Sequence, residues 1–212
     1  PEYMTNLSNF GVMYHRAGDI DKAAPYFKEA LDRRIATMAP HNPALLTSRN
    51  LMALVYFERG EIAEAERQYR EVLAARREVF GDHHHVAGSL FALGQAVLRQ
   101  DRDDEALELF EESIAMYRRT MSETFYETAN PLVSAGRLHL KYQRYSAAEP
   151  FLTQAHHIRS ESYGVDHLRT ASAGLYLGQC RIQHGKFAET ESLILHVLRV
   201  FSENYAPDHR AV

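Results

Sequence analysis

The chain has 212 residues, of which 45% are hydrophobic and 25% are charged, a composition that indicates a folded globular protein and excludes a disordered chain. Its formal net charge of −4 gives no overall basic field, so we expect no nucleic-acid partner. A single cysteine, Cys180, excludes an internal disulfide, and no apolar run has the length of a membrane span or the form of a secretion signal, so we expect a cytoplasmic protein with no membrane partner.

A pattern of small and aromatic residues recurs along the chain at a fixed spacing. Between Ala53 and Tyr69, a small residue is followed by an aromatic residue, a glycine, an alanine and a second aromatic residue. The same order begins at Gly11, and Gly18 and Gly60 lie 42 residues apart. A period of this size indicates an array of repeats, each packed against its neighbours.

The first repeat, residues 3–40, is predicted to form two helices. Leu7, Phe10 and Tyr14 lie at i, i+3 and i+7, on one face of a helix that Gly18 ends. A second apolar stripe follows that glycine. Neither helix can bury its stripe alone, so we expect the two to pack as an antiparallel hairpin.

The second repeat, residues 41–82, begins with a helix-start signal. Asn42 is a good N-cap residue, and Pro43 is favoured at the first helical position. Its two helices are predicted to span residues 43–59 and 62–79.

The last three repeats, residues 83–123, 124–165 and 166–207, keep the register with some losses. The third is one residue shorter than the others, and we expect the missing residue in a loop. In the fifth, Arg181 stands at the aromatic place and Thr190 at the alanine place, so this repeat is expected to be the most irregular.

Small residues recur where the two helices of each pair are expected to come closest. They are Gly11, Ala53, Gly94, Gly136 and Gly178. Glycine inside a helix costs about 1 kcal/mol relative to alanine, so its recurrence at one register indicates close helix packing.

These positions resemble the tetratricopeptide repeat, whose helix pairs carry Leu, Gly or Ala, Tyr, and then Ala, Phe and Ala at these separations. The 42-residue period and the linker 164–167, Gly-Val-Asp-His, are similar to the kinesin light chain branch; 206–209 is a second such linker, 81–83 is a shortened form, and 122–125 departs from it. The resemblance implies an all-α, right-handed superhelical solenoid of about five antiparallel helix pairs spanning residues 1–212. Because a repeat is already under way at the first residue, we expect this array to be a fragment of a longer chain.

The sequence contains no motif of a catalytic or cofactor site. A Gly-x-Ser-x-Gly nucleophile motif, a phosphate-binding glycine loop and a dinucleotide-binding fingerprint are all absent. Cys180 falls in a row of apolar residues and is expected to be a buried hydrophobe. We therefore predict a non-enzymatic protein with no catalytic residue, no cofactor and no metal centre.

The triplet His83, His84 and His85 is the densest group of metal-binding side chains. Adjacent side chains on a helix or loop point in different directions, whereas zinc requires ligands that converge. We expect the triplet to be a solvated loop, and binding of an adventitious metal stays open as the alternative.

A protein or peptide ligand in the concave groove is the function that the sequence favours. In the family that the chain resembles, ligands touch first-helix residues that do not pack on the second helix. Counting by the repeat gives Asn9, Asn50, Leu54, Phe57, Phe91, Gln95, Arg99, Arg137, Lys141, Tyr176 and Gln179. Amides can bond a peptide backbone, aromatic rings supply apolar pockets, and the cations favour acidic residues in the ligand.

Other interpretations stay open from the sequence. The aromatic residues could pack between neighbouring repeats, and the cations could lie on a solvated helix face. A different function is also open: a self-associating structural or sensory segment of a larger, bacterial-type regulatory protein, which forms homo-oligomers through uncapped end repeats.

Overall fold

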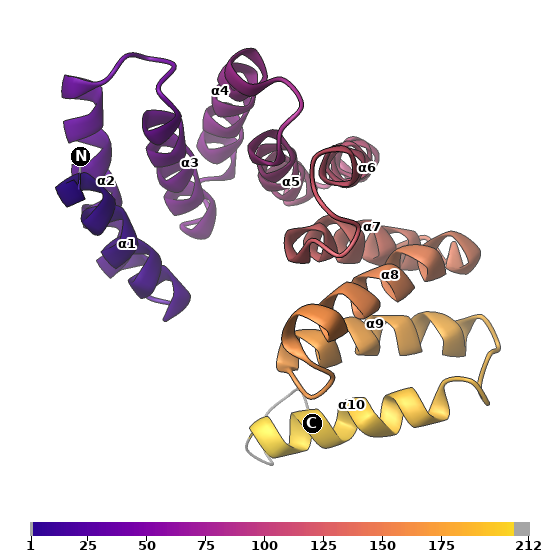
Figure 1. The fold of residues 1–212 in the computed structure, drawn as a ribbon. Helices are drawn as coiled ribbons and strands as arrows, with labels where there is room; N and C mark the ends of the chain where they lie inside the picture. Colours follow the sequence, from indigo (N-terminus) through magenta and orange to yellow (C-terminus); the bar gives the residue numbers. More distant parts are fainter. Residues whose placement is uncertain (1, 206–212) are drawn as a thin grey trace. The chain divides into compact units, whose positions relative to one another are not determined.

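The computed structural model describes residues 2–205 and contains only helices as regular elements among them (Figure 1). In chain order these are α1 (Glu2–Arg16), α2 (Ile20–Thr37), α3 (Pro43–Glu58), α4 (Ile62–Phe80), α5 (His84–Leu98), α6 (Asp103–Thr120), the short 3-10 helix η1 (Tyr126–Thr128), α7 (Ala129–Lys141), α8 (Tyr145–Tyr163), α9 (Leu168–Gln183) and α10 (Glu191–Asn204). The predicted all-α class is confirmed. No helix within residues 2–205 is both long and apolar enough to cross a membrane. The linker predicted at 206–209 lies outside the described residues.

Local sequence explains where helices begin. The side chain of Asn42 accepts a hydrogen bond of 2.9 Å from the amide of Ala44, and Pro43 is the first residue of α3, as predicted. At α2, the side chain of Asp19 accepts a bond of 3.0 Å from the amide of Lys22. Each contact satisfies an amide that has no partner inside its helix.

A residue with a left-handed backbone follows each first helix. The φ angles are 80° at Gly18, 81° at Gly60, 57° at Asp101, 55° at Gln143 and 81° at Gly185. Glycine adopts this conformation without steric cost, whereas Asp101 and Gln143 adopt it at a penalty. These five turns mark the repeat in the backbone itself.

The short third repeat loses its residue in the connection between α4 and α5. Residues 81–83 alone separate these helices, whereas residues 38–42 separate α2 from α3. The prediction that the missing residue lies in a loop is therefore confirmed.

The chain divides into two compact units, Pro1–Ala106 (unit 1) and Leu107–Val212 (unit 2). In unit 1 each helix from α1 to α5 packs against the next, and in unit 2 the same holds from α7 to α10 (Figure 1). Core clusters form around Phe27 and Val55 in unit 1 and around Leu152 and Cys180 in unit 2. Cys180 is buried, which confirms its predicted role as a buried hydrophobe. The prediction of a single repeat array over residues 1–212 stays a prediction.

The small residues lie where helices come closest, as expected. A Cβ atom added at Gly11, Gly136 or Gly178 would lie 2.4 Å from Phe27, 2.6 Å from Leu152 or 2.3 Å from Ile194, respectively. These distances are shorter than any that two carbon atoms can adopt without a shift in the structure. Glycine therefore sets the separation of α1 from α2, of α7 from α8 and of α9 from α10.

The fifth helix pair is irregular, as predicted. Helix α8 begins two residues after its left-handed turn residue Gln143, whereas α10 begins six residues after Gly185. Thr190 lies just before α10, and its hydroxyl donates a hydrogen bond of 2.6 Å to the carbonyl oxygen of Lys186. Because this side chain bonds the backbone locally, it competes with the helical turn that alanine would favour.

Candidate functional site

The predicted site residues of unit 1 follow helical spacing on two first helices. Asn50, Leu54 and Phe57 lie at i, i+4 and i+7 on α3, and Phe91 and Gln95 lie at i and i+4 on α5. All five side chains are half-buried. Each set therefore forms one stripe that is partly accessible to a ligand.

Arg99 joins these two helices at the surface of unit 1. It follows α5 directly, and its guanidinium carbon lies 5.6 Å from the centroid of the Phe57 ring. On α3, the side-chain oxygen of Asn50 is buried without a hydrogen-bond partner among the described residues. Asn9 is exposed on α1 and lines a hollow formed by α1 residues alone, so the structure does not bring it into that cluster.

Unit 2 brings four predicted residues together in one cleft of about 200 Å³ between α7 and α9. We call this the unit 2 cleft, and it is lined by Arg137, Leu140, Lys141, Tyr176 and Gln179. The guanidinium carbon of Arg137 lies 4.9 Å from the centroid of the Tyr176 ring. Sequence reasoning thus placed these side chains on one surface.

Arginine covers an aromatic ring in both units. The rings of Phe57 and Tyr176 were expected to offer open apolar pockets, but the guanidinium groups of Arg99 and Arg137 lie over them. A guanidinium that contacts a ring through cation–π attraction still has N–H groups that can bind a carboxylate. The surface is therefore suited to a charged group more than to a purely apolar one.

Carboxylates are almost absent from the first helix of each pair. The only ones are Glu2 at the start of α1 and Glu58 at the end of α3, and α5, α7 and α9 contain none. The second helices hold more carboxylates, which Lys and Arg balance in α2 and α4 but not in α6, where residues 103–105 are Asp-Asp-Glu. The negative charge of the chain is therefore concentrated away from the first-helix surfaces.

Two buried arginines that sequence reasoning missed position the first helices of unit 1. The Nη1 atom of Arg34 donates hydrogen bonds to the hydroxyls of Ser8 on α1, at 2.9 Å, and Ser48 on α3. Arg76, 42 residues later, donates a bond of 2.8 Å to the hydroxyl of Ser89 on α5. Burial lowers the pKa of Arg34. The repeat spacing of these arginines was the signal that could have identified them.

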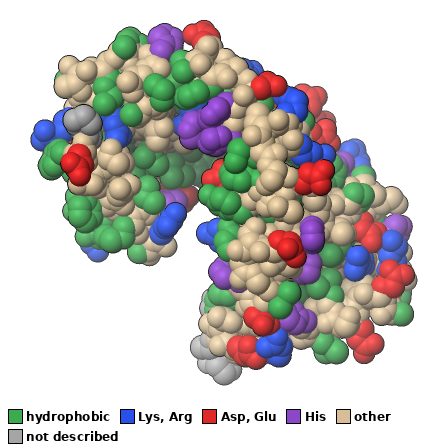
Figure 2. Space-filling view, in the orientation of Figure 1, with side chains coloured by type: hydrophobic (Ala, Val, Ile, Leu, Met, Phe, Trp, Pro, Cys, Tyr) green, Lys and Arg blue, Asp and Glu red, His purple; other side chains and the backbone are tan. Residues whose placement is uncertain are grey.

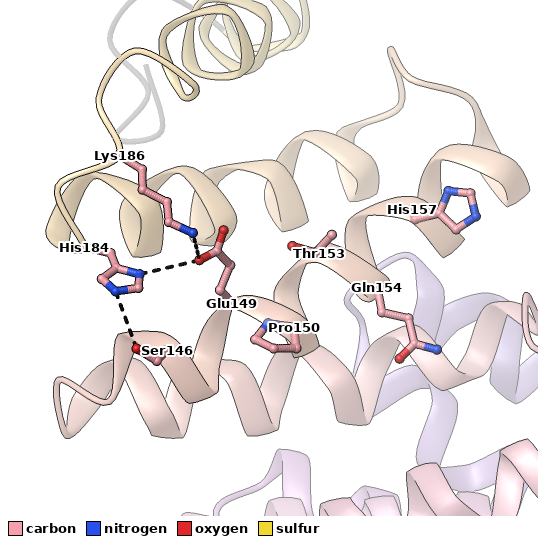
Figure 3. A pocket seen from close by; sticks show the side chains of 8 residues that line it. All are labelled: Ser146, Glu149, Pro150, Thr153, Gln154, His157, His184 and Lys186. Atoms are coloured by element: carbon pink, nitrogen blue, oxygen red, sulfur yellow. Dashed lines mark hydrogen bonds and ion pairs between the residues drawn. The ribbon is translucent and has the colours of Figure 1, made fainter.

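A polar cluster on unit 2 surrounds Glu149 of α8 (Figure 3). Lys186 donates a hydrogen bond of 2.7 Å to this carboxylate, Arg181 donates one of 3.2 Å, and His184 lies 3.5 Å away. The other ring nitrogen of His184 lies 3.4 Å from the hydroxyl of Ser146. Hydrogen bonding from Lys186, and then from Arg181, lowers the pKa of Glu149 against the opposing effect of burial. These ion pairs connect α8 to α9 and to the turn before α10, so their role is structural.

The histidine triplet is not the solvated loop that we expected. Its members lie close together, with one ring nitrogen of each of His83, His84 and His85 within 4.8 Å of the others. His83 caps α5 by accepting a hydrogen bond of 3.2 Å from the amide of His85, so the triplet begins a helix. The expectation that the rings diverge was wrong because the cap folds the ring of His83 back over the helix start.

The family model of the tetratricopeptide repeat matches residues 2–78 and, in an overlapping match, residues 46–119. This chain is a tetratricopeptide repeat protein. The matches cover more than half of its length, and the five left-handed turns extend the same spacing to residue 185. No curated protein sequence matches this tetratricopeptide repeat protein.

Solved structures place its fold beside kinesin light chain-like repeats. A putative kinesin light chain with nearly identical TPR-like repeats, from Podosopora anserina, is 18% identical with a TM-score of 0.72, and the match covers 95% of each chain. BtubC (BKLC) from P. vanneervenii is 20% identical with a TM-score of 0.77, over 96% of this chain and 82% of that one. A Rap protein, solved in complex with competence and sporulation factor, is 13% identical with a TM-score of 0.76, over 95% of this chain and 54% of that one. At these identities the similarities show the fold, which kinesin light chain-like repeats share, as the sequence predicted.

Proposed function

We propose that this tetratricopeptide repeat protein is a non-enzymatic module that binds a protein or peptide partner on its first-helix surfaces. The near absence of carboxylates from α1, α3, α5, α7 and α9 carries the proposal. Arg99, Arg137 and Lys141 lie on these surfaces while the second helices hold most of the acidic residues. This distribution favours a ligand with acidic residues, since charge complementarity steers association and selects partners.

The unit 2 cleft supports the same ligand chemistry in more detail. Arg137, which lies over the ring of Tyr176, offers a planar pair of donors that matches a carboxylate. Lys141 lies one helical turn further along α7, and the Gln179 amide lines the cleft from α9. A cleft of about 200 Å³ accommodates one acidic side chain with part of its backbone. On this proposal the unit 2 cleft binds a segment whose backbone bonds the amide of Gln179, and Asn50 and Gln95 offer amides for the same kind of contact on unit 1.

A protein of similar fold supports partner binding, and the cysteine content bears on the cellular compartment. The Rap protein is a structural neighbour whose crystals contain a complex with competence and sporulation factor, so a protein of this fold holds a partner. The chain has one cysteine, Cys180, which is buried, and this absence of cysteine pairs is usual in cytoplasmic proteins. We infer a cytoplasmic role with no nucleic-acid or membrane partner.

Capture from a lysate of the source cells tests this proposal. The variant Asn50→Ala/Phe57→Ala/Arg137→Glu should lose a partner that the wild-type chain retains, because it removes an amide, a ring and a cation from the first-helix surfaces. Far-UV circular dichroism should show equal helical content for both proteins. Arg118→Glu serves as a charge control, since Arg118 lies on the second helix α6 and bonds Gln154 of α8. Equal capture by the triple variant and the wild type would contradict the proposal.

Self-association is a second candidate, favoured by apolar side chains on α1 and α10. Tyr3, Phe10 and Met13 on α1 are 55%, 51% and 51% exposed, and Leu195 and Leu198 on α10 are 60% and 47% exposed. Exposed apolar groups of this size mark contact surfaces in many proteins. Sedimentation velocity at rising concentration should then show oligomers, which the substitution Leu195→Lys should convert to monomers. A wild-type protein that stays monomeric throughout would rule this candidate out.

A further inference from the structure

Three imidazole rings converge at the start of α5, and they go beyond the proposed binding of a protein partner. Histidine side chains gather on the surface where α4 and α5 meet (Figure 2). The ring centroids of His83, His84 and His85 lie 4.1, 4.3 and 4.9 Å apart in their three pairs. One nitrogen from each ring lies within 4.8 Å of the other two, the only such group of histidine, cysteine or carboxylate side chains found among residues 2–205.

We propose that His83, His84 and His85 form a binding site for a divalent transition-metal ion of the Zn²⁺ class. Imidazole nitrogen is a preferred ligand of Zn²⁺, at about 2.0–2.1 Å from the ion. Ligand nitrogens on a tetrahedral Zn²⁺ are therefore ~3.3 Å apart. The ring nitrogens lie within 4.8 Å of one another, so the proposal requires the side chains to rotate until this separation is reached. Three protein ligands leave the fourth position of the ion to water.

Neighbouring groups hold the rings together. The ring of Phe80, the last residue of α4, stacks on His83 at a centroid distance of 4.8 Å and meets the edge of the His85 ring at 5.5 Å. A metal ion binds the unprotonated form of each imidazole.

Two features oppose a cation at this place and limit its affinity. The guanidinium of Arg76 donates a hydrogen bond to the carbonyl oxygen of His85, and the N-terminal end of α5 carries a partial positive charge. The N-cap of α5 also competes with metal binding. A neutral imidazole has one unprotonated nitrogen, and His83 uses it to accept a hydrogen bond from the amide of His85. Coordination through either nitrogen of His83 replaces that hydrogen bond. Metal binding therefore has a local signature at the amide of His85.

Calorimetric titration of the untagged protein with Zn²⁺ tests the proposal. The wild type should bind one ion per chain, and the affinity should fall at least roughly tenfold in His84→Ala, since even outer partners of metal ligands matter by that factor. His83→Asn should lose affinity to the same extent while the melting temperature holds, because asparagine also accepts a bond at an N-cap. This variant separates loss of a ligand from loss of the fold.

A matched control uses the other adjacent histidine pair of the chain. The double variant His156→Ala/His157→Ala removes two imidazoles from α8 and should leave the zinc affinity unchanged. In an amide spectrum of the wild type, Zn²⁺ should shift the His85 resonance first. Absence of a one-to-one zinc complex, unchanged affinity in His84→Ala and His83→Asn, or an equal loss in the α8 control would overturn the proposal. Each of these readouts is independent of the protein partner.

Discussion

Replacement of Gly136 by alanine should destabilise the protein, although the same change in an exposed helix stabilises it by about 1 kcal/mol. The new Cβ would lie 2.6 Å from Cγ and 2.7 Å from Cδ2 of Leu152, a residue with no exposed surface. Cγ is fixed next to the backbone of α8, so α7 and α8 must move apart. Overpacking of this kind costs about 1–3 kcal/mol, and we expect a net loss of about 1–2 kcal/mol in the free energy of unfolding, measured by urea denaturation.

The partner residue offers a matched rescue. Leu152→Ala alone should lose about 2–5 kcal/mol, because it leaves a cavity in the core. Gly136→Ala/Leu152→Ala should be more stable than Leu152→Ala alone, since the added methyl group then fills part of that cavity. A Gly136→Ala protein as stable as the wild type would show that the two helices do not touch at this glycine.

Removal of the Glu66 carboxylate should have the second large effect. The side chain of Glu66, on α4, is 13% exposed. Its carboxylate accepts hydrogen bonds of 2.6 Å from Gln100 and 2.6 Å from Arg102, and it forms an ion pair of 2.7 Å with Arg70. Burial alone would raise the pKa of Glu66, but the bonds from Arg102, Gln100 and Arg70 lower it to about 2. Glu66→Gln should lose about 1–3 kcal/mol at neutral pH, because two arginines remain without their shared carboxylate.

The pH dependence of this loss has a definite sign. The folded pKa of Glu66 is about 2, and the ordinary value is 4.5, so the unfolded chain binds the proton more readily. The carboxylate thus stabilises the fold fully above about pH 5, and its contribution falls as the pH drops toward 2. The stability difference between wild type and Glu66→Gln should shrink on acidification. Glu71→Gln, at an exposed partner of Arg67 on the same helix, should change stability by less than about 0.5 kcal/mol, and an equal loss in both variants would contradict this account.

Much of the fold follows from periodic signals in the sequence. The spacing of Gly18 and Gly60 predicts a turn that recurs along the chain, and both glycines have a left-handed backbone. The Asn42-Pro43 pair determines where α3 begins. Gly136 could be predicted as a close contact because a glycine inside a helix is costly unless a neighbour requires it. Such signals depend on local geometry and on a pattern repeated several times.

The remaining features depend on how individual side chains meet across helices. Stacking of Arg137 on Tyr176 requires a particular rotamer on each of two helices, and sequence spacing alone does not specify it. The sequence pattern places Arg34 among the exposed residues of an amphipathic helix, yet its guanidinium is buried and donates hydrogen bonds to two serine hydroxyls. The convergence of the triplet follows from the cap at His83, which a pattern of three identical residues does not reveal. The structure therefore adds which side chains come together, both between helices and at the start of one helix.

The most direct test of the central claim is the affinity of the captured partner for two variants of equal charge. Arg137→Glu/Lys141→Glu reverses two cations of the unit 2 cleft, and Arg118→Glu/Arg119→Glu reverses two on the second helix α6. Both proteins should keep the helical content of the wild type. Binding through the first helices predicts that the cleft variant binds at least about tenfold more weakly at low salt, with little change in the α6 variant. Equal affinities for the two variants would contradict binding through the first-helix surfaces.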